Sequence, residues 1–178
     1  MSPVVVLVGP PGAGKSTVAR KVGTRLSLAV LDTDAVVEAV AGRRVADIFT
    51  TDGEDAFRAM EEQAVTDSLS SHDGVLSLGG GAVLSARTRA ALHGHLVVLL
   101  EVGMTEGIRR TGMGTTRPLL AGINPRATYR ALLEARMPLY REVATHVVNT
   151  DRRSPGSVAA DVAALVHPEP GVGEDGQP

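Results

Sequence analysis

The chain has no cysteine among its 178 residues. Disulfide bonds and thiolate metal sites are therefore excluded, and the composition fits a reducing compartment. Tryptophan is absent too, and the only aromatic residues are two phenylalanines and two tyrosines. We therefore expect a core of Val, Leu, Ile and Ala, and no aromatic platform on which the bases of a single-stranded nucleic acid could stack.

Neither a strong net charge nor a long apolar run is present. The 18 basic and 20 acidic residues give a formal net charge of −2, which offers no electrostatic footprint for nucleic acid or an anionic membrane. No run approaches the roughly 20 apolar residues that cross a bilayer, and the apolar run 4–8 is too short for a signal peptide. We expect a cytoplasmic protein, monomeric by default, with no nucleic-acid or membrane partner.

Short β-branched runs alternate with helical patterns along the chain. Continuous apolar strands of this kind belong to a parallel sheet that is covered on both faces. The expected strands span residues 4–8, 28–31, 74–78, 96–102 and 146–148. The expected helices begin near Lys15, Asp34, Glu54, Ser85, Met104, Arg126 and Pro155. This order predicts an α/β fold with three αβα layers around a central parallel sheet of five strands.

One domain is expected over residues 1–166, because the length suits a single core and no linker interrupts it. Residues 112–125 are rich in Gly and Pro without periodicity, which predicts a mobile lid loop. Residues 167–178 are dense in Gly, Pro and acidic residues, and we expect a disordered tail there.

The strongest chemical signal spans residues 9–16, which read Gly-Pro-Pro-Gly-Ala-Gly-Lys-Ser. This sequence matches the phosphate-loop pattern and lies between a predicted strand and a predicted helix, as the motif requires. Its backbone N–H groups and the helix N-terminus would bind phosphate oxygens. Lys15 would add a charge at the β- and γ-phosphates, and the Ser16 hydroxyl could ligate Mg²⁺. A glycine-rich turn without a ligand is the alternative.

Asp32 and Asp34 end the second predicted strand, at the edge where open α/β sheets bind ligands. One carboxylate could hold Mg²⁺ through water, and the other could face an acceptor hydroxyl. Alternatively, Asp34 simply caps the following helix.

Two arginines lie on or beside apolar helix faces. Arg58 and Glu61 are three residues apart, so they form either a surface ion pair or an arginine that a carboxylate aims at an anionic substrate. Arg136 lies near the centre of an apolar stripe that includes Tyr129 and Tyr140. A buried guanidinium must meet an anion, which is either a substrate carboxylate or an internal salt-bridge partner.

Further candidates follow the third strand and the lid. Gly79, Gly80 and Gly81 would permit close approach of the backbone to a ligand, although a plain turn also uses glycine. Arg117 lies in the lid loop, and Arg110 precedes it. Mobile arginines near a phosphate loop are typical of a lid that closes on the transferring group, although most surface arginines have no such role.

Together these motifs resemble the shikimate kinase family, which has a phosphate-loop kinase fold. The resemblance runs from Val4 to about Leu165. Beyond the phosphate loop it includes Leu31-Asp32-Thr33-Asp34, Ala46-Asp47-Ile48-Phe49, Gly53-Glu54, Phe57-Arg58 with Glu61, Leu78-Gly79-Gly80-Gly81-Ala82, Arg117-Pro118-Leu119-Leu120 and Arg136 with Tyr140. The resemblance implies transfer of a phosphoryl group from MgATP to the 3-hydroxyl of shikimate, giving shikimate 3-phosphate and ADP on the route to chorismate and the aromatic amino acids.

The resemblance also implies roles for individual residues. Catalysis would involve Lys15, Asp34 and Arg117. ATP would be bound by Gly12, Ala13, Gly14, Lys15, Ser16, Thr17, Arg110, Arg117, Arg153 and Pro155. Shikimate would be bound within the segment 33–61 and beyond it, by Asp34, Arg58, Glu61, Gly79, Gly80, Gly81 and Arg136. The metal Mg²⁺ would be held by Ser16 and Asp32.

Two other functions stay open at this point. A related kinase could phosphorylate gluconate or a nucleotide, although a nucleobase acceptor would favour stacking aromatics, which are scarce here. A non-catalytic ATP-binding module is also conceivable, but it would leave Asp34 without a purpose.

Overall fold

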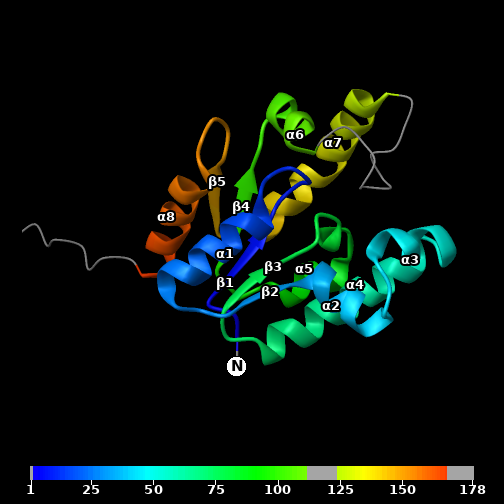
Figure 1. The fold of residues 1–178 in the computed structure, drawn as a ribbon, viewed down its shortest axis with the longest axis horizontal. Coiled ribbons are helices and arrows are strands. Elements are labelled where there is room, and N and C mark those ends of the chain that lie inside the picture. The colour runs from blue at the N-terminus through cyan, green and yellow to red at the C-terminus, as the bar shows by residue number, and fades with distance from the viewer. Residues whose placement is uncertain (1, 112–123, 168–178) are drawn as a thin grey trace, which may run out of the picture.

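A computed structural model describes residues 2–111 and 124–167. Its five strands are β1 (Val5–Val8), β2 (Val30–Asp32), β3 (Val75–Ser77), β4 (Val97–Glu101) and β5 (His146–Asn149). They form one parallel sheet in the order β2-β3-β1-β4-β5 (Figure 1). The predicted α/β fold with a five-stranded parallel sheet is confirmed. The second strand begins two residues later than expected, because Leu28 donates its N–H to Gly23 and closes the preceding helix.

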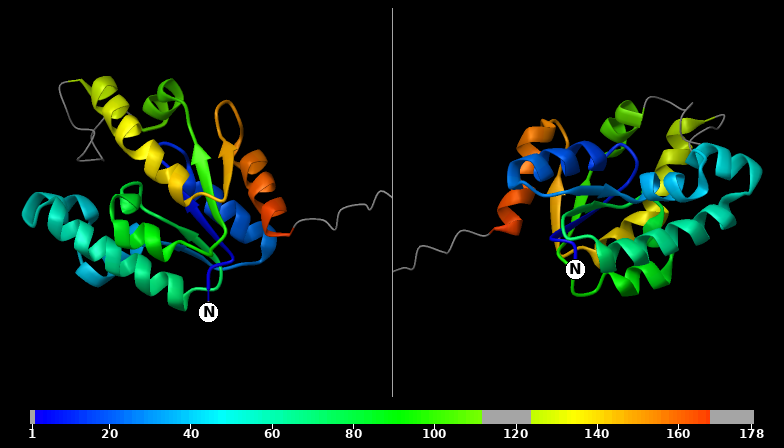
Figure 2. Two further views of the ribbon diagram at one scale, coloured as in Figure 1. Left: turned by 180° about the vertical axis from the view of Figure 1, so that it is seen from behind. Right: turned by 60° about the horizontal axis from the view of Figure 1, so that its bottom comes forward.

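Helices cover both faces of the sheet, as the alternation in β1 dictates. Val5 and Leu7 pack against α1 (Lys15–Leu26) and α8 (Pro155–Val166) on one face. Val6 and Val8 pack on the other face with α4 (Glu54–Ser71), α5 (Ala86–Ala91) and α7 (Pro125–Val143). Both layers are visible when the views are compared (Figures 1 and 2). The sheet is thus the central layer of the three that the sequence predicts.

A smaller core lies beyond the edge of the sheet. It joins α2 (Thr33–Ala41), α3 (Val45–Thr51) and α4 through Val37, Ile48 and Phe57. Helix α3 was not predicted from the sequence; it has only seven residues and, within the described part of the chain, no side-chain cap. Its buried Ile48 fixes it against its neighbours, so packing rather than local propensity holds this helix.

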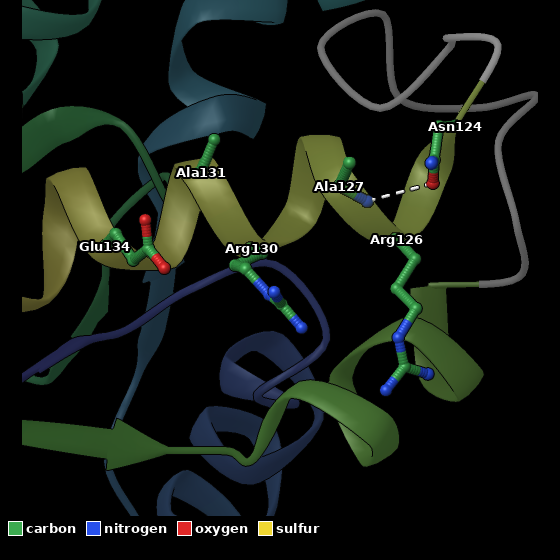
Figure 3. A pocket seen from close by; sticks show the side chains of 6 residues that line it. All are labelled: Asn124, Arg126, Ala127, Arg130, Ala131 and Glu134. Atoms are coloured by element: carbon green, nitrogen blue, oxygen red, sulfur yellow. Dashed lines mark hydrogen bonds between the residues drawn. The ribbon is translucent and has the colours of Figure 1, made fainter.

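The remaining elements are the short 3₁₀ helix η1 (Ala82–Leu84) and α6 (Met104–Thr111). Helix α7 corrects one boundary. Pro125, expected in the lid loop, is the first residue of α7, and the Asn124 side chain accepts the N–H of Ala127 at 3.1 Å (Figure 3). Proline is favoured at a first helical position because its missing N–H is not needed there. The rest of the predicted lid, 112–123, and the tail from 168 onward lie outside the described residues.

Within residues 2–111 and 124–167, no helix is long and apolar enough to cross a membrane.

Candidate active site

The phosphate loop occupies residues 9–14, between β1 and α1. Gly12 and Gly14 both have φ of 84°, a left-handed conformation that favours glycine. Lys15 folds back over the loop, with Nζ at 2.7 Å from the Gly9 carbonyl oxygen. Among the residues that the structure describes, no side chain caps the start of α1, and the first turn of α1 contains no acidic residue. These first-turn N–H groups are therefore suited to bind an anion.

Ser16 and Asp32 join the start of α1 to the end of β2. The Ser16 hydroxyl donates to Asp32 Oδ2 at 2.7 Å, and Asp32 Oδ1 accepts the N–H of Asp34 at 3.0 Å. The residue that caps α2 is therefore Asp32, and the alternative in which Asp34 is the cap is wrong. The cap position belongs to Asp32 because its backbone is extended, whereas Asp34 already lies within the helix.

Two adjacent hard oxygens at this position fit Mg²⁺, which binds proteins through one or two side chains and otherwise through water and phosphate oxygens. The described residues contain no cluster of three or more His, Cys, Asp or Glu that would form a complete metal cage. The donor set therefore suits an ion that arrives with a nucleotide.

A cavity of about 480 Å³ opens beside the phosphate loop. It is lined by Ala13, Gly14, Thr17, Val18, Glu106, Arg109, Arg110, Thr150, Arg152, Arg153, Pro155 and Val158. Arg110 is fixed at its wall, with Nη2 at 2.7 Å from the Thr150 carbonyl oxygen and Nε at 2.8 Å from Glu106. Hydrogen bonds from Arg109 and Arg110 lower the pKa of Glu106 to about 2. Arg153 forms an ion pair with Asp161 at 2.8 Å. The cavity therefore gathers Arg110, Arg153 and Pro155 beside the phosphate loop.

The three glycines that follow β3 lie against charged side chains from α2 and α4. A Cβ atom on Gly79 would lie 2.6 Å from Asp34 Oδ1 and would also collide with Glu61 Oε1. A Cβ atom on Gly81 would overlap the Arg58 guanidinium. Only glycine leaves room for these contacts. The turn therefore brings Asp34, Arg58 and Glu61 together, although they are distributed over two helices.

Arg58 is held on several sides. Its Nη1 lies 2.6 Å from Glu61 Oε2, and Glu54 lies 3.3 Å from its Nη2. The guanidinium also lies over both phenylalanine rings of the chain, at 5.2 Å from the centre of Phe57 and 5.8 Å from that of Phe49. The ion pair that the spacing predicts does form, and it is largely buried rather than a surface pair, because the Glu61 side chain is only 3% exposed.

The two carboxylate oxygens of Glu61 differ: Oε2 forms the ion pair with Arg58, and Oε1 lies outside this pair. Its Oε1 is buried and has no hydrogen-bond partner in the part of the chain that the structure describes. Burial raises the pKa of the Glu61 carboxyl above its ordinary value of 4.5, while Arg58 acts in the opposite direction. A buried acceptor without a donor is costly, so this oxygen is suited to accept a hydrogen bond from a ligand.

Arg136 comes from α7 and is 7% exposed. Among residues 2–111 and 124–167, no carboxylate forms a salt bridge with it. Its guanidinium lies close enough to the Tyr140 hydroxyl and the Glu61 carboxyl to lower the pKa of each, although burial outweighs this effect at both groups. The internal salt bridge considered for Arg136 is therefore not found among these residues. A buried guanidinium in this position favours an anionic ligand.

Arg117 lies outside the described residues. The sequence analysis did not single out Thr150, which holds Arg110, or a second cavity of about 370 Å³ along α7. That cavity is lined by Asn124, Arg126, Ala127, Arg130, Ala131 and Glu134 (Figure 3). No local pattern marked Thr150, because its partner Arg110 lies 40 positions away in the sequence.

The phosphate loop, the cavity beside it, the Arg58–Glu61 ion pair and the buried Arg136 define a phosphate-loop kinase that acts on a small anionic acceptor. The family model described as shikimate kinase matches residues 11–167. The chain belongs to the shikimate kinase family, and it is an enzyme of that class.

Curated relatives match this chain over nearly its full length. The chain is 57% identical over 175 residues to a shikimate kinase of Saccharopolyspora erythraea, and the matched region covers 98% of this chain and 100% of that protein. It is 56% identical over 162 residues to a shikimate kinase of Mycobacterium tuberculosis, which covers 91% and 92% of the two chains.

Solved structures show the same fold. A shikimate kinase from Acinetobacter baumannii, in complex with shikimate, superposes with a TM-score of 0.88 at 35% identity, over 93% of each chain. A gluconokinase from Sinorhizobium meliloti reaches a TM-score of 0.56 at 18% identity, over 91% of this chain and 90% of that chain. This second likeness shows the fold alone.

Proposed function

We propose that this protein transfers the γ-phosphoryl group of MgATP to the 3-hydroxyl of shikimate, giving shikimate 3-phosphate and ADP. The observation that carries the proposal is the set of charges around the triple-glycine turn. Arg58 and the buried Arg136 can bind a carboxylate, Asp34 and Glu61 can accept hydrogen bonds from hydroxyls, and shikimate presents both kinds of group. The A. baumannii relative with shikimate bound supports this choice of acceptor.

Side chains of both charge signs hold the acceptor. Arg58 and Arg136 bind its carboxylate, since guanidinium groups match a carboxylate bidentately. The unpartnered Oε1 of Glu61 accepts a hydrogen bond from a ring hydroxyl. These contacts orient the ring so that the reacting hydroxyl faces Asp34.

The chemical step needs positioning more than covalent help. Asp34 accepts a hydrogen bond from the 3-hydroxyl and takes its proton as the new oxygen–phosphorus bond forms and the bond between the γ-phosphorus and the bridging oxygen breaks. The N–H groups of the phosphate loop and Lys15 stabilise the charge that develops on the β- and γ-phosphates. Arg117 adds positive charge at the transferring group.

Several residues hold the nucleotide. Gly12 to Thr17 bind its phosphates, and the cavity with Arg110, Arg153 and Pro155 receives its base and ribose. Ser16 and Asp32 hold Mg²⁺, which supplies charge neutralisation at the phosphates. We also propose that the protein acts in the cytoplasm, as a monomer, on the route to chorismate.

An acceptor panel tests the proposal. Purified protein with MgATP is offered shikimate, gluconate or AMP, and ADP release is followed while phosphorus NMR identifies the product. We expect rapid turnover with shikimate alone and a product phosphorylated at the 3-hydroxyl. Preferential turnover of gluconate or AMP would overturn the substrate assignment. ATP binding without turnover of any acceptor would indicate a non-catalytic module.

A further inference from the structure

Both tyrosines of the chain lie on helix α7, at positions 129 and 140. They are among the most buried side chains, at 1% and 0% exposure. Eleven residues are about three helical turns, or roughly 16 Å along the axis, so the two rings leave the same side of α7 at well-separated points. A buried tyrosine hydroxyl needs a hydrogen-bond partner, and the identity of each partner is informative.

Tyr129 is bonded to the phosphate loop. Its hydroxyl donates to the Pro11 carbonyl oxygen at 2.6 Å, across 118 residues of sequence. A Cβ atom on Gly107 of α6 would overlap the Tyr129 hydroxyl, and one on Gly12 would lie 2.7 Å from the Gly107 carbonyl oxygen. The loop is therefore held between α6 and α7 at a point where only glycines fit.

Tyr140 is hydrogen-bonded to the triple-glycine turn, where we propose that the acceptor binds. Its hydroxyl donates to the Gly80 carbonyl oxygen, in the middle of the triple-glycine turn. Burial raises the pKa of Tyr140 to about 12, so the phenol keeps its proton and remains a donor throughout the physiological range. The charge of Arg136, one helical turn earlier, acts on the pKa of the same hydroxyl in the opposite direction.

The two backbone segments that these tyrosines hold also touch each other. A Cβ atom on Gly80 would lie 3.3 Å from the Pro11 ring. The phosphate loop and the triple-glycine turn are thus adjacent, and the single helix α7 is hydrogen-bonded to both. Simple filling of the core would not require either hydroxyl to bond to a ligand-binding segment.

We propose that Tyr129 and Tyr140 are positioning residues, and that α7 uses their hydroxyls to set the phosphate loop and the triple-glycine turn at a fixed separation for phosphoryl transfer. The Tyr129 hydroxyl positions the loop that binds the nucleotide phosphates. The Tyr140 hydroxyl positions the turn that receives the acceptor.

Removal of one hydroxyl at a time tests this division. Tyr129→Phe should raise KM for ATP roughly threefold to tenfold, as expected for one neutral hydrogen bond, while KM for shikimate stays within twofold. Tyr140→Phe should do the reverse. Thr88→Val is the matched control, because it removes a buried hydroxyl of α5 that has no partner among the described residues. It should leave both KM values unchanged.

A spectroscopic measurement separates positioning from general stability. Protein labelled with 3-fluorotyrosine contains two fluorine signals, and the two Phe variants assign them. MgADP should shift the Tyr129 signal, and shikimate should shift the Tyr140 signal, in each case with little effect on the other.

The proposal is overturned if both Phe variants lower the melting temperature but leave both KM values unchanged, which would make the tyrosines ordinary core residues. It is equally overturned if each variant raises the two KM values alike, or if saturating ligand shifts neither fluorine signal. The Tyr140 half rests on shikimate being the acceptor, whereas MgADP tests the Tyr129 half whichever acceptor is the best substrate.

Discussion

Arg58 and Glu61 form a buried ion pair, with Nη1 of the arginine 2.6 Å from Oε2 of the glutamate. The glutamate keeps its second oxygen for another donor. This arrangement fixes the guanidinium while leaving part of it accessible, since 20% of the Arg58 side chain is exposed. If Arg58 binds the acceptor carboxylate as proposed, the charge on Glu61 is a condition for acceptor binding.

Glu61→Gln should raise KM for shikimate at neutral pH, because the amide holds Arg58 less strongly than a carboxylate does. The wild-type protein should show the same rise on acidification. Burial raises the pKa of Glu61, so its protonation begins at a higher pH than that of an exposed glutamate. Shikimate binding should therefore weaken as the pH falls through this raised pKa. The difference between the two pH profiles of KM should disappear at low pH. A constant difference would contradict this role.

Asp34→Asn should lower kcat severely, by roughly a hundredfold or more, with little change in ATP affinity. The backbone N–H of Asp34 still bonds to Asp32, so the start of α2 is preserved. Steady-state kinetics with nucleotide titration would check this. A variant whose only defect was weaker nucleotide binding would reassign Asp34 to metal binding.

Lys15→Ala should abolish turnover while the fold survives, because the substitution removes a charge at the phosphates and leaves the strand, loop and helix intact. The other lysine of the chain offers a control. Lys21 is exposed on the same helix, and Lys21→Ala should retain full activity. Circular dichroism would establish that both variants are folded. Normal turnover in Lys15→Ala would remove the kinase assignment.

Arg136→Ala should chiefly raise KM for shikimate. Loss of a charge-assisted contact to a carboxylate costs roughly 2–5 kcal/mol, and Arg136 lies in a helix that is already formed before substrate arrives. Arg141→Ala is a suitable control on the same helix, because Arg141 is 62% exposed and pairs with Glu101. An unchanged KM in Arg136→Ala would exclude a carboxylate contact.

Arg117→Ala, in contrast, should chiefly lower kcat at saturating shikimate and ATP. A lid residue need only contact the reacting complex, so its loss removes stabilisation of the transition state. An unchanged kcat would exclude this role.

Gly79→Ala should reduce activity strongly, because its Cβ atom would displace the carboxylates of Asp34 and Glu61. Gly156→Ala is the matched substitution, since its Cβ atom would meet only Ser154 Oγ, at 3.9 Å, among the described residues, and the activity of this variant should be normal. Equal activity of the two variants would show that close approach at Gly79 is unimportant.

The sequence by itself determined the frame of this protein. The β-branched runs and the residues that start helices depend on neighbours within one or two turns, so they predicted the five-stranded parallel sheet and the phosphate loop. The motif residues near the strand ends, Asp32, Asp34 and the three glycines, were identifiable for the same reason. Helix α3 was missed because its stability comes from burial of Ile48 rather than from local signals.

Only the tertiary structure decided which of these residues meet. The strand order β2-β3-β1 places the segments after three strands side by side, and this order is set by packing across the whole chain. It brings Asp34 and Glu61 to Gly79, bonds Tyr129 to Pro11, and places the charge of Arg136 near the Tyr140 hydroxyl and the Glu61 carboxyl. Such contacts span up to 118 residues. No local pattern encodes them, because each depends on how separate helices pack on a common sheet.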